Sequence, residues 1–332
     1  MGQFRRQAAA SPFRTVATTD NSSQLYSLLP FGMGQQAFKC IHATVIVFRI
    51  DPETGGLQSS RMATQIYYEV VGEGQPMLVL HGGYLDHRHM VDALEPIFEH
   101  RQGWKRVYID IPGHGQSQVD VGIDTQEQVL DIILDFMEGF APGERFAIVG
   151  ESRGGYLARG IVYKKPEMVS GAMFIVPGRH VVASQESVPP HVTLVKADDL
   201  IPTLESNEIS RFERLVVQNL EILEKIRRTK LPAAELADVD HLKTIDDNYE
   251  FSFDVDSPEI PFENPVLFLL GRQDASVGYR DAWKAIENFP RATFAILDKA
   301  GHSLSWEQSQ LFSALANEWL QRVEELDRSS AP

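Results

Sequence analysis

Beyond Met62, short apolar runs alternate with stretches of helical periodicity, and glycine-containing turns separate them. The apolar runs have strand length and occupy residues 65–71, 77–80, 106–110, 146–149, 172–176, 266–270 and 293–297. The helical stretches occupy residues 86–100, 125–140, 155–165, 279–288 and 306–323. Strands that alternate with helices form a mostly parallel sheet with helices on both faces. The sequence therefore predicts an α/β fold.

One long segment interrupts this alternation. Residues 178–262 have no buried-strand signal, but apolar side chains recur at helical spacing over residues 208–230, which predicts a helix there. The sequence therefore predicts a core of residues 62–177 and 263–326, with a helical lid of residues 178–262 inserted between two core strands. The apolar stripe of this lid fits packing onto the core. A dimer surface is the alternative, and the oligomeric state stays open.

Residues 1–61 differ in composition from the rest of the chain. The first 19 residues contain no Asp or Glu, carry Arg5, Arg6 and Arg14, and are rich in Ala, Ser and Thr. Such a composition is typical of transit peptides. A disordered tail, or translated sequence upstream of a second start at Met62, is the interpretation that we favour. Residues 43–50 are β-branched and precede turn residues 51–56. We therefore expect a partly disordered N-terminal extension that can hold a hairpin.

Composition narrows the classes of function. The net charge of −15 argues against nucleic-acid binding, which needs a basic surface. Cys40 is the only cysteine, which excludes an intramolecular disulfide and a zinc site built on several cysteines. No apolar run approaches the roughly 18 residues that a membrane span needs. We expect a cytoplasmic protein with a small-molecule substrate and no metal or organic cofactor. A mitochondrial location is the alternative if residues 1–19 act as a transit peptide.

The segment Gly150-Glu151-Ser152-Arg153-Gly154 matches the pattern G-x-S-x-G. In this pattern the serine occupies a strained turn between a strand and a helix, and the turn exposes its hydroxyl. The pattern alone arises by chance in about one chain in ten of this length. Here it follows an apolar strand and opens a helical stretch, which is the context that the motif requires. We therefore predict that Ser152 is a nucleophile.

A serine hydroxyl needs a base, and the base needs a partner that orients it. His302 lies between the last predicted strand and the C-terminal helix, and Asp274 lies at the end of the preceding strand. A carboxylate there can accept the second imidazole N–H, fix the tautomer and stabilise the imidazolium. The chain order Ser, Asp, His is the order of the α/β-hydrolase motif set. We predict a Ser152–His302–Asp274 triad.

A tetrahedral intermediate also needs hydrogen-bond donors for its oxyanion. His81-Gly82-Gly83 follows a strand, and we assign the backbone N–H of Gly83 as one donor. The second donor is the N–H of Arg153, at the start of the helix after Ser152. We expect residues 110–115 and His81 to play structural roles in their turns. Candidate residues of the substrate pocket are Tyr84, Glu151, Arg179 and His180.

Taken together, these motifs resemble the α/β-hydrolase superfamily. The resemblance rests on residues 81–83, 110–115, 150–154, 271–274 and 301–302, and it extends over residues 62–326. It implies a sheet of roughly eight strands flanked by helices, with a helical lid after the sixth strand. The chain departs from many members at Arg153, where a small, Met or aromatic residue is common. That departure bears on the polarity of the pocket.

Serine as the nucleophile separates this chain from superfamily members that open epoxides or displace halide with a carboxylate. The expected reaction is therefore acyl transfer to water, as in a carboxylesterase-like serine hydrolase that cleaves a small ester, thioester or lactone through an acyl-enzyme. Hydrolysis of a carbon–carbon bond in a ring-cleavage diketone is the alternative. An alternative of another class is a ligand receptor or interaction protein on a hydrolase scaffold.

Overall fold

The computed structural model describes residues 13–16, 41–49, 63–119, 122–178 and 188–330. The described strands form one nine-stranded sheet of order β1-β2-β3-β5-β4-β6-β7-β8-β9. The first three strands pair antiparallel, and they are β1 (Phe13–Val16), β2 (Ile41–Arg49) and β3 (Ala63–Val71). The remaining strands pair parallel with one another, and they are β4 (Gln75–Leu80), β5 (Trp104–Ile109), β6 (Phe146–Glu151), β7 (Val169–Ile175), β8 (Val266–Gly271) and β9 (Ala292–Leu297).

This sheet confirms the predicted α/β-hydrolase fold class, with one difference in strand number. The sheet has nine strands instead of roughly eight, because β1 pairs with β2 at the edge. Part of the segment with transit-peptide composition, residues 13–16, is this edge strand. The predicted hairpin turn at residues 51–56 lies outside the described residues, and β2 pairs antiparallel with β3 across it.

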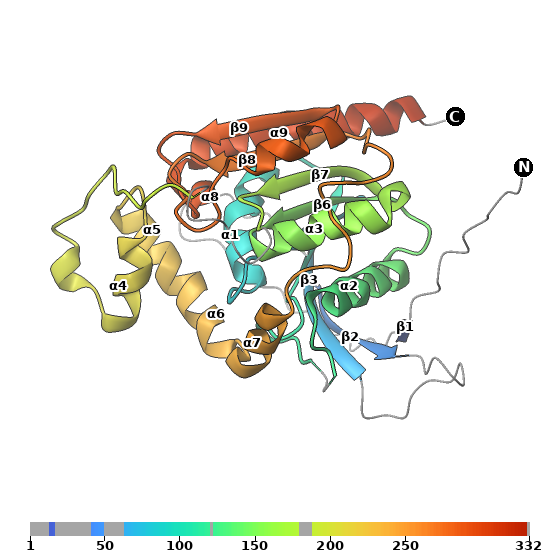
Figure 1. Cartoon of the computed structure of the whole chain (residues 1–332), viewed down its shortest axis with the longest axis horizontal. Helices are drawn as coiled ribbons and strands as arrows, with labels where there is room; N and C mark the ends of the chain where they lie inside the picture. The colour runs from blue at the N-terminus through green and yellow to red at the C-terminus, as the bar shows by residue number, and fades with distance from the viewer. Residues whose placement is uncertain (1–12, 17–40, 50–62, 120–121, 179–187, 331–332) are drawn as a thin grey trace, which may run out of the picture.

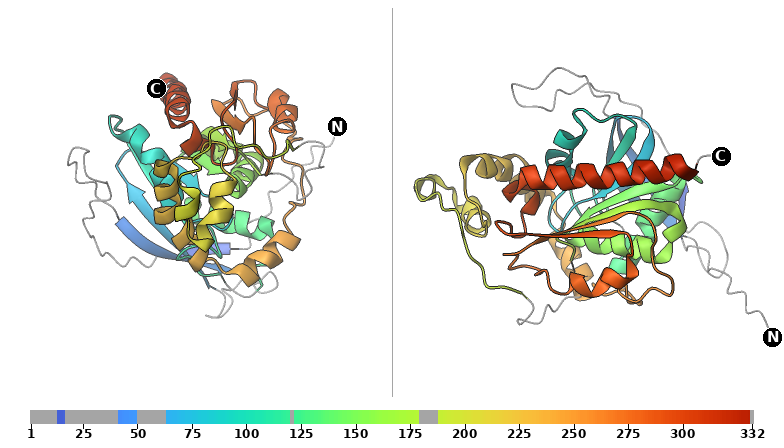
Figure 2. Two further views of the ribbon diagram at one scale, coloured as in Figure 1. Left: turned by 90° about the vertical axis from the view of Figure 1, so that its left-hand side faces the viewer. Right: turned by 90° about the horizontal axis from the view of Figure 1, so that it is seen from above.

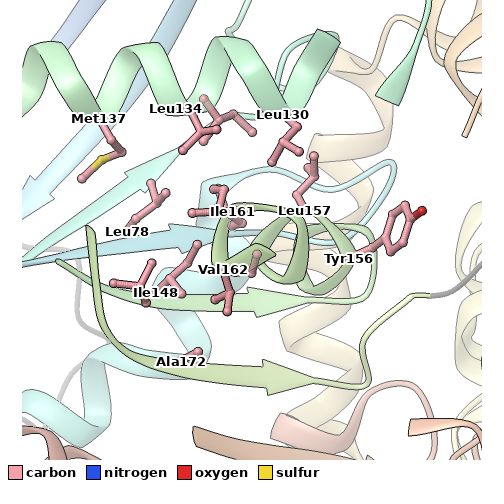
Figure 3. Packing of buried hydrophobic residues seen from close by; sticks show 14 of the residues in the cluster. Leu78, Leu130, Leu134, Met137, Ile148, Tyr156, Leu157, Ile161, Val162 and Ala172 are labelled. Atoms are coloured by element: carbon pink, nitrogen blue, oxygen red, sulfur yellow. The ribbon is translucent and has the colours of Figure 1, made fainter. Parts of the chain in front are cut away.

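Helices cover both faces of the sheet (Figures 1 and 2). On one face lie α1 (His87–Phe98) and α9 (Ser309–Ser330), which share a buried cluster with Met77 and Val79. On the other face lie α2 (Gln126–Phe140) and α3 (Arg153–Lys164), packed on Leu78 and Leu80. Figure 3 shows this second face, where side chains of α2 and α3 meet Leu78 and Ile148. Adjacent strand residues point to opposite faces, so both faces of the central strands are apolar.

Helix α2 begins at a sequence motif, and several of the other described helices are short. A capping box starts α2, in which the Thr125 hydroxyl accepts a hydrogen bond from the N–H of Gln128 at 3.2 Å. The helix predicted over residues 279–288 is a 3₁₀ helix, η4 (Ala282–Asn288). The C-terminal helical stretch comprises α8 (Leu304–Glu307) and α9. A further 3₁₀ turn, η1 (Pro166–Met168), precedes β7.

The segment between β7 and β8, called the insert below, contains several short helices in its described part. It follows the seventh strand instead of the predicted sixth, because β1 adds a strand at the edge of the sheet. Its described elements are η2 (Ile201–Thr203), α4 (Ser206–Glu213), α5 (Leu220–Lys225), the π-helical turn η3 (Ile226–Lys230), α6 (Leu231–Leu236) and α7 (Val239–Asp247). The expectation of one helix over residues 208–230 is wrong. Asn219 has an extended backbone, and its side chain caps α5 by accepting from the N–H of Ile222 at 2.8 Å.

The insert lies beyond the carboxyl ends of the parallel strands (Figure 1). Part of its buried apolar side chains, among them Phe212 and Ile226, form a separate cluster that includes Trp306 of α8. Ligands of open α/β sheets bind at the carboxyl ends of the strands. The fold therefore places the insert beside the edge where a site is expected. Among the described residues, no helix is long and apolar enough to cross a bilayer.

Candidate active site

Ser152 occupies the turn between β6 and α3. Its φ of 51° lies in the left-handed region, which residues other than glycine rarely adopt. Two glycines let the turn close. A Cβ on Gly154 would lie 2.4 Å from the carbonyl oxygen of Leu80, and a Cβ on Gly150 would lie 2.3 Å from the carbonyl oxygen of Gly154. The strained turn and its glycines match the local structure that the G-x-S-x-G pattern predicts.

The structure brings Ser152, His302 and Asp274 together. The Oγ of Ser152 lies 3.0 Å from Nε2 of His302, and Nδ1 of His302 lies 2.9 Å from Oδ2 of Asp274. A carboxylate only accepts, so Nδ1–H donates to Asp274 and Nε2 can accept from the serine hydroxyl. Asp274 is fully buried. Its Oδ1 accepts from the N–H groups of Ser276 at 2.8 Å and Val277 at 3.1 Å.

Burial and charge act in opposite directions on the imidazole. Desolvation lowers the pKa of His302, but the charge and the hydrogen bond of Asp274 outweigh it. The pKa of His302 is therefore raised above its ordinary value. A raised pKa makes the imidazole a stronger acceptor for the serine proton.

The loop after β4 lies against the turn that holds Ser152. A Cβ on Gly82 would come within 3.4 Å of the Ser152 Cβ, and a Cβ on Gly83 would lie 3.1 Å from Nε of Arg153. His81 braces this loop, because Nδ1 donates to the Gly82 carbonyl at 2.8 Å and Nε2 accepts from the N–H of Ile111 at 2.9 Å. No described residue accepts a hydrogen bond from the N–H of Gly83 or Arg153. These two N–H groups are the candidate oxyanion donors.

The side chains of Arg153 and Tyr84 lie together at α7 of the insert. The guanidinium of Arg153 donates to Oε1 of Gln126 at 3.1 Å and to Asp246, and it lies 5.2 Å from the ring centroid of Tyr249. The Tyr84 hydroxyl donates to Oδ2 of Asp246 at 2.7 Å. One predicted pocket residue, Tyr84, and one predicted oxyanion donor, Arg153, therefore contact the same carboxylate of the insert.

A model of the family described as "alpha/beta hydrolase fold" matches residues 75–309. The chain belongs to the α/β-hydrolase fold family. The matched region contains the triad residues, both glycines of the turn and the whole insert. Family membership and the assembled groups together support general hydrolase activity.

Relatives and solved structures cover most of this α/β-hydrolase. The chain is 26% identical over 278 residues to a 2-hydroxy-6-oxononadienedioate/2-hydroxy-6-oxononatrienedioate hydrolase of Burkholderia vietnamiensis, covering 78% of this chain and 91% of the relative. It is 23% identical to a pimeloyl-[acyl-carrier protein] methyl ester esterase of Vibrio campbellii, covering 78% and 99%. An alpha/beta superfamily hydrolase from Oenococcus oeni PSU-1 superposes with a TM-score of 0.71 and 25% identity, covering 78% and 96%.

The other predicted pocket residues have different positions in this α/β-hydrolase. Glu151 is buried, and its Oε1 accepts a hydrogen bond from Nε2 of His89 at 2.8 Å. Desolvation raises the pKa of Glu151, but the neighbouring His89 reverses the shift, so the pKa is lowered and the carboxylate stays charged. Glu151 is thus held inside the protein by His89 instead of facing solvent. Arg179 and His180 lie outside the described residues.

One cation beside the triad was missed by sequence reasoning. Lys230 ends η3, its Nζ donates to Oγ of Ser303 at 3.0 Å, and it lies 4.6 Å from the ring centroid of Trp306. Burial lowers the pKa of Lys230. Among the described residues, no carboxylate lies within ion-pair distance of its ammonium group. The only sequence signal was a lysine near the end of a helical stretch, which is usually a solvated residue.

A second buried cluster has metal-ligand chemistry, and it comprises Asp86, His87 and Asp110. Burial lowers the pKa of His87, but hydrogen bonds with Asp110 and Glu69 outweigh it and raise the pKa to about 10. Asp110 also accepts from the N–H of Gln116 at 2.8 Å. The cluster is an ion-pair network that holds the turn of residues 110–115.

Proposed function

We propose that the chain hydrolyses a carbon–carbon bond in a carboxylate-bearing diketone of the ring-cleavage type. The reaction is assigned to Ser152 as nucleophile, His302 as base and Asp274 as the residue that orients His302. The observation that carries the choice of substrate is Lys230, a desolvated ammonium beside His302 that has no described carboxylate within ion-pair distance. Glu151 and Glu307 act on its charge only from farther away. A desolvated cation without a close counter-ion is costly, and an anionic group of the substrate would lower that cost.

The chemistry follows from the positions of the groups. Ser152 attacks the carbonyl carbon while Nε2 of His302 takes the hydroxyl proton, and the N–H groups of Gly83 and Arg153 hold the oxyanion. The carbon–carbon bond then breaks, and its electron pair leaves as an enolate, which His302 protonates at carbon. Water, activated by His302, hydrolyses the acyl-serine. The ammonium of Lys230 attracts the negative charge of the leaving fragment.

The names of the similar proteins support carbon–carbon bond hydrolysis as the first candidate, ahead of simple ester cleavage. Four of the similar proteins are named as 2-hydroxy-6-oxononadienedioate/2-hydroxy-6-oxononatrienedioate hydrolases. Ester hydrolysis is the second candidate, and it is supported by the relative named as a methyl ester esterase. Both reactions use the same nucleophile and the same oxyanion donors, and they differ in the leaving group.

We assign the insert the role of a lid in this reaction. It lies at the carboxyl ends of the strands (Figure 1) and brings Asp246 and Lys230 to the residues beside the nucleophile. This position lets it exclude water from the reacting groups. Residues 62–177 and 263–326 would then supply the reacting groups, and residues 178–262 would supply the cover.

A substrate panel tests the proposal. Wild type and Ser152→Ala are compared on a 2-hydroxy-6-oxo-dienedioate, whose conjugated chromophore is lost on cleavage, and on p-nitrophenyl esters of increasing chain length. We expect multiple turnover of the dienedioate by wild type and none by Ser152→Ala. Ester turnover without dienedioate turnover would transfer the assignment to the second candidate. Binding of these compounds without any turnover would contradict both and favour a receptor.

A further inference from the structure

A carboxylate of the insert bridges the two loops that carry the candidate oxyanion donors. Oδ2 of Asp246 accepts from the Tyr84 hydroxyl at 2.7 Å, and Oδ1 accepts from Nη2 of Arg153. Tyr84 directly follows Gly83, and Arg153 directly follows Ser152. One side chain therefore contacts a residue of each loop.

The geometry of these two loops is sensitive to such a contact. Tyr84 has a φ of 59°, a left-handed conformation that a residue other than glycine adopts only when its surroundings hold it there. The side chain of Arg153 packs on the other loop, because a Cβ on Gly83 would lie 3.1 Å from its Nε. A shift of either side chain would move the backbone that carries a donor. Oxyanion stabilisation depends on donors being preorganised at hydrogen-bonding distance.

The helix that carries Asp246 is itself anchored to the core. The N–H of Asp238, at the start of α7, donates to the carbonyl oxygen of Gly113 at 3.0 Å. The N–H of Gln126 donates to the carbonyl oxygen of Asn248, just after α7, at 3.1 Å. Ile245 is buried in the core cluster of α2 and α3. Asp246, whose side chain is 37% exposed, is therefore a peripheral group on a fixed helix.

The protonation states suit this arrangement. Burial and the hydrogen bond to Asp246 raise the pKa of Tyr84, so the phenol keeps its proton at neutral pH and remains a donor. Both carboxylate oxygens of Asp246 are then engaged by donors from the core. No second acceptor of this kind joins Tyr84 and Arg153 among the described residues.

We infer that Asp246 is a positioning residue of the oxyanion hole. By holding Tyr84 and Arg153 at once, it sets the separation between the N–H groups of Gly83 and Arg153 when the insert is docked. The lid thereby completes the site that it covers. This inference rests on the proposed function, because it takes Ser152 as the nucleophile.

The rate at which a fluorophosphonate labels the protein tests the inference. In this reaction the serine oxygen attacks phosphorus, fluoride leaves, and the phosphoryl oxygen needs the oxyanion donors. We expect Asp246→Ala to slow labelling by about tenfold or more. Asp246→Asn should label at a rate between those of wild type and Asp246→Ala. The matched control is Asp247→Asn, which changes the exposed neighbour on the same helix and should label at the wild-type rate. Labelling of Asp246→Ala at the wild-type rate would overturn the inference, whereas an unlabelled wild type would instead contradict the proposed function.

Three further readouts separate positioning from a loss of fold. With the substrate identified by the panel, Asp246→Ala should lower kcat and leave KM nearly unchanged. Affinity for a trifluoromethyl ketone analogue, which binds as a tetrahedral adduct, should fall by the same factor as kcat/KM. Tyr84→Phe removes only a hydroxyl and should reproduce part of the loss, and its effect should not add to that of Asp246→Ala. A change in KM alone, or additive effects of the pair, would overturn the inference.

Discussion

The core side and the insert side of the candidate site are held by different kinds of contact. On the core side, Asp274 is fully buried and accepts two backbone N–H groups, and Ser152 occupies a turn closed by glycine contacts. On the insert side, Asp246 and Lys230 reach the site through single side chains from short helices. We therefore propose that the core fixes the reacting groups, whereas the insert adjusts their surroundings and selects the substrate.

The largest expected effect comes from the core side. Asp274→Asn removes the carboxylate that orients His302, and a change of this kind lowers kcat by about 10⁴-fold in a well-studied serine protease. The matched control is Asp281→Asn, an acid that follows the same strand, and it should keep wild-type kcat. Steady-state kinetics on the substrate identified by the panel measure both. Equal activity of wild type and Asp274→Asn would remove Asp274 from the triad.

Wild type and Asp274→Asn should also differ in the pH dependence of kcat/KM. The reaction needs a neutral imidazole, so kcat/KM rises as pH rises through the pKa of His302. Burial lowers that pKa and Asp274 raises it by more, so the acidic limb of the wild-type profile should lie above the ordinary histidine pKa of about 6.5. In Asp274→Asn the limb should move to lower pH. A limb that stays in place would contradict the pairing of His302 with Asp274.

The next largest expected effect is on the free energy of unfolding, and it compares a residue of the core side with a residue of the insert side. A Cβ on Gly154 would lie 2.4 Å from the Leu80 carbonyl oxygen, so Gly154→Ala should lower the free energy of unfolding by about 2–3 kcal/mol. Leu236 of the insert is 50% exposed, and Leu236→Ala should change the free energy of unfolding by less than about 0.5 kcal/mol. Urea unfolding measures both. Similar losses in the two variants would break the distinction between a rigid core turn and a tolerant insert.

A smaller effect concerns substrate choice. Lys230→Met keeps the length of the side chain and removes its charge, so kcat/KM for a carboxylate-bearing substrate should fall by about 10- to 100-fold, the range of a charge-assisted hydrogen bond. Kinetics on a neutral p-nitrophenyl ester should change much less. Lys243→Met, an exposed lysine of α7, is the matched control. A uniform loss on charged and neutral substrates would refute the anion-binding role of Lys230.

The smallest expected effect lies at the outer contact of the insert. Arg228 and Lys225 both contact Asp92 of α1, and the Arg228 side chain is 46% exposed. Exposed ion pairs contribute at most about 1 kcal/mol. Arg228→Ala should therefore lower the unfolding free energy by about 0.5 kcal/mol, and added salt should erase the difference between this variant and wild type. A larger, salt-independent loss would show that this contact, and not the buried cluster with Trp306, holds the insert.

The sequence predicted the core side far better than the insert side. Ser152, Asp274 and His302 each stand at a strand end, so local signals of strand, turn and helix indicated their positions before any contact was known. Asp246 and Lys230 carry no such signal, because their roles depend on how the insert packs. The apolar spacing near residues 208–230 predicted one regular helix. A cap at Asn219 and the π-helical turn at residues 226–230 divide it and redirect Lys230 toward Ser303.

In the proposed reaction, Ser152 is a nucleophile that His302 activates. The most direct test of this assignment is to label the wild-type protein with a fluorophosphonate and map the modified peptide by mass spectrometry. We expect a single adduct on Ser152, formed in wild type and absent after His302→Ala. An adduct on another residue, or full labelling of Ser152 without His302, would contradict it.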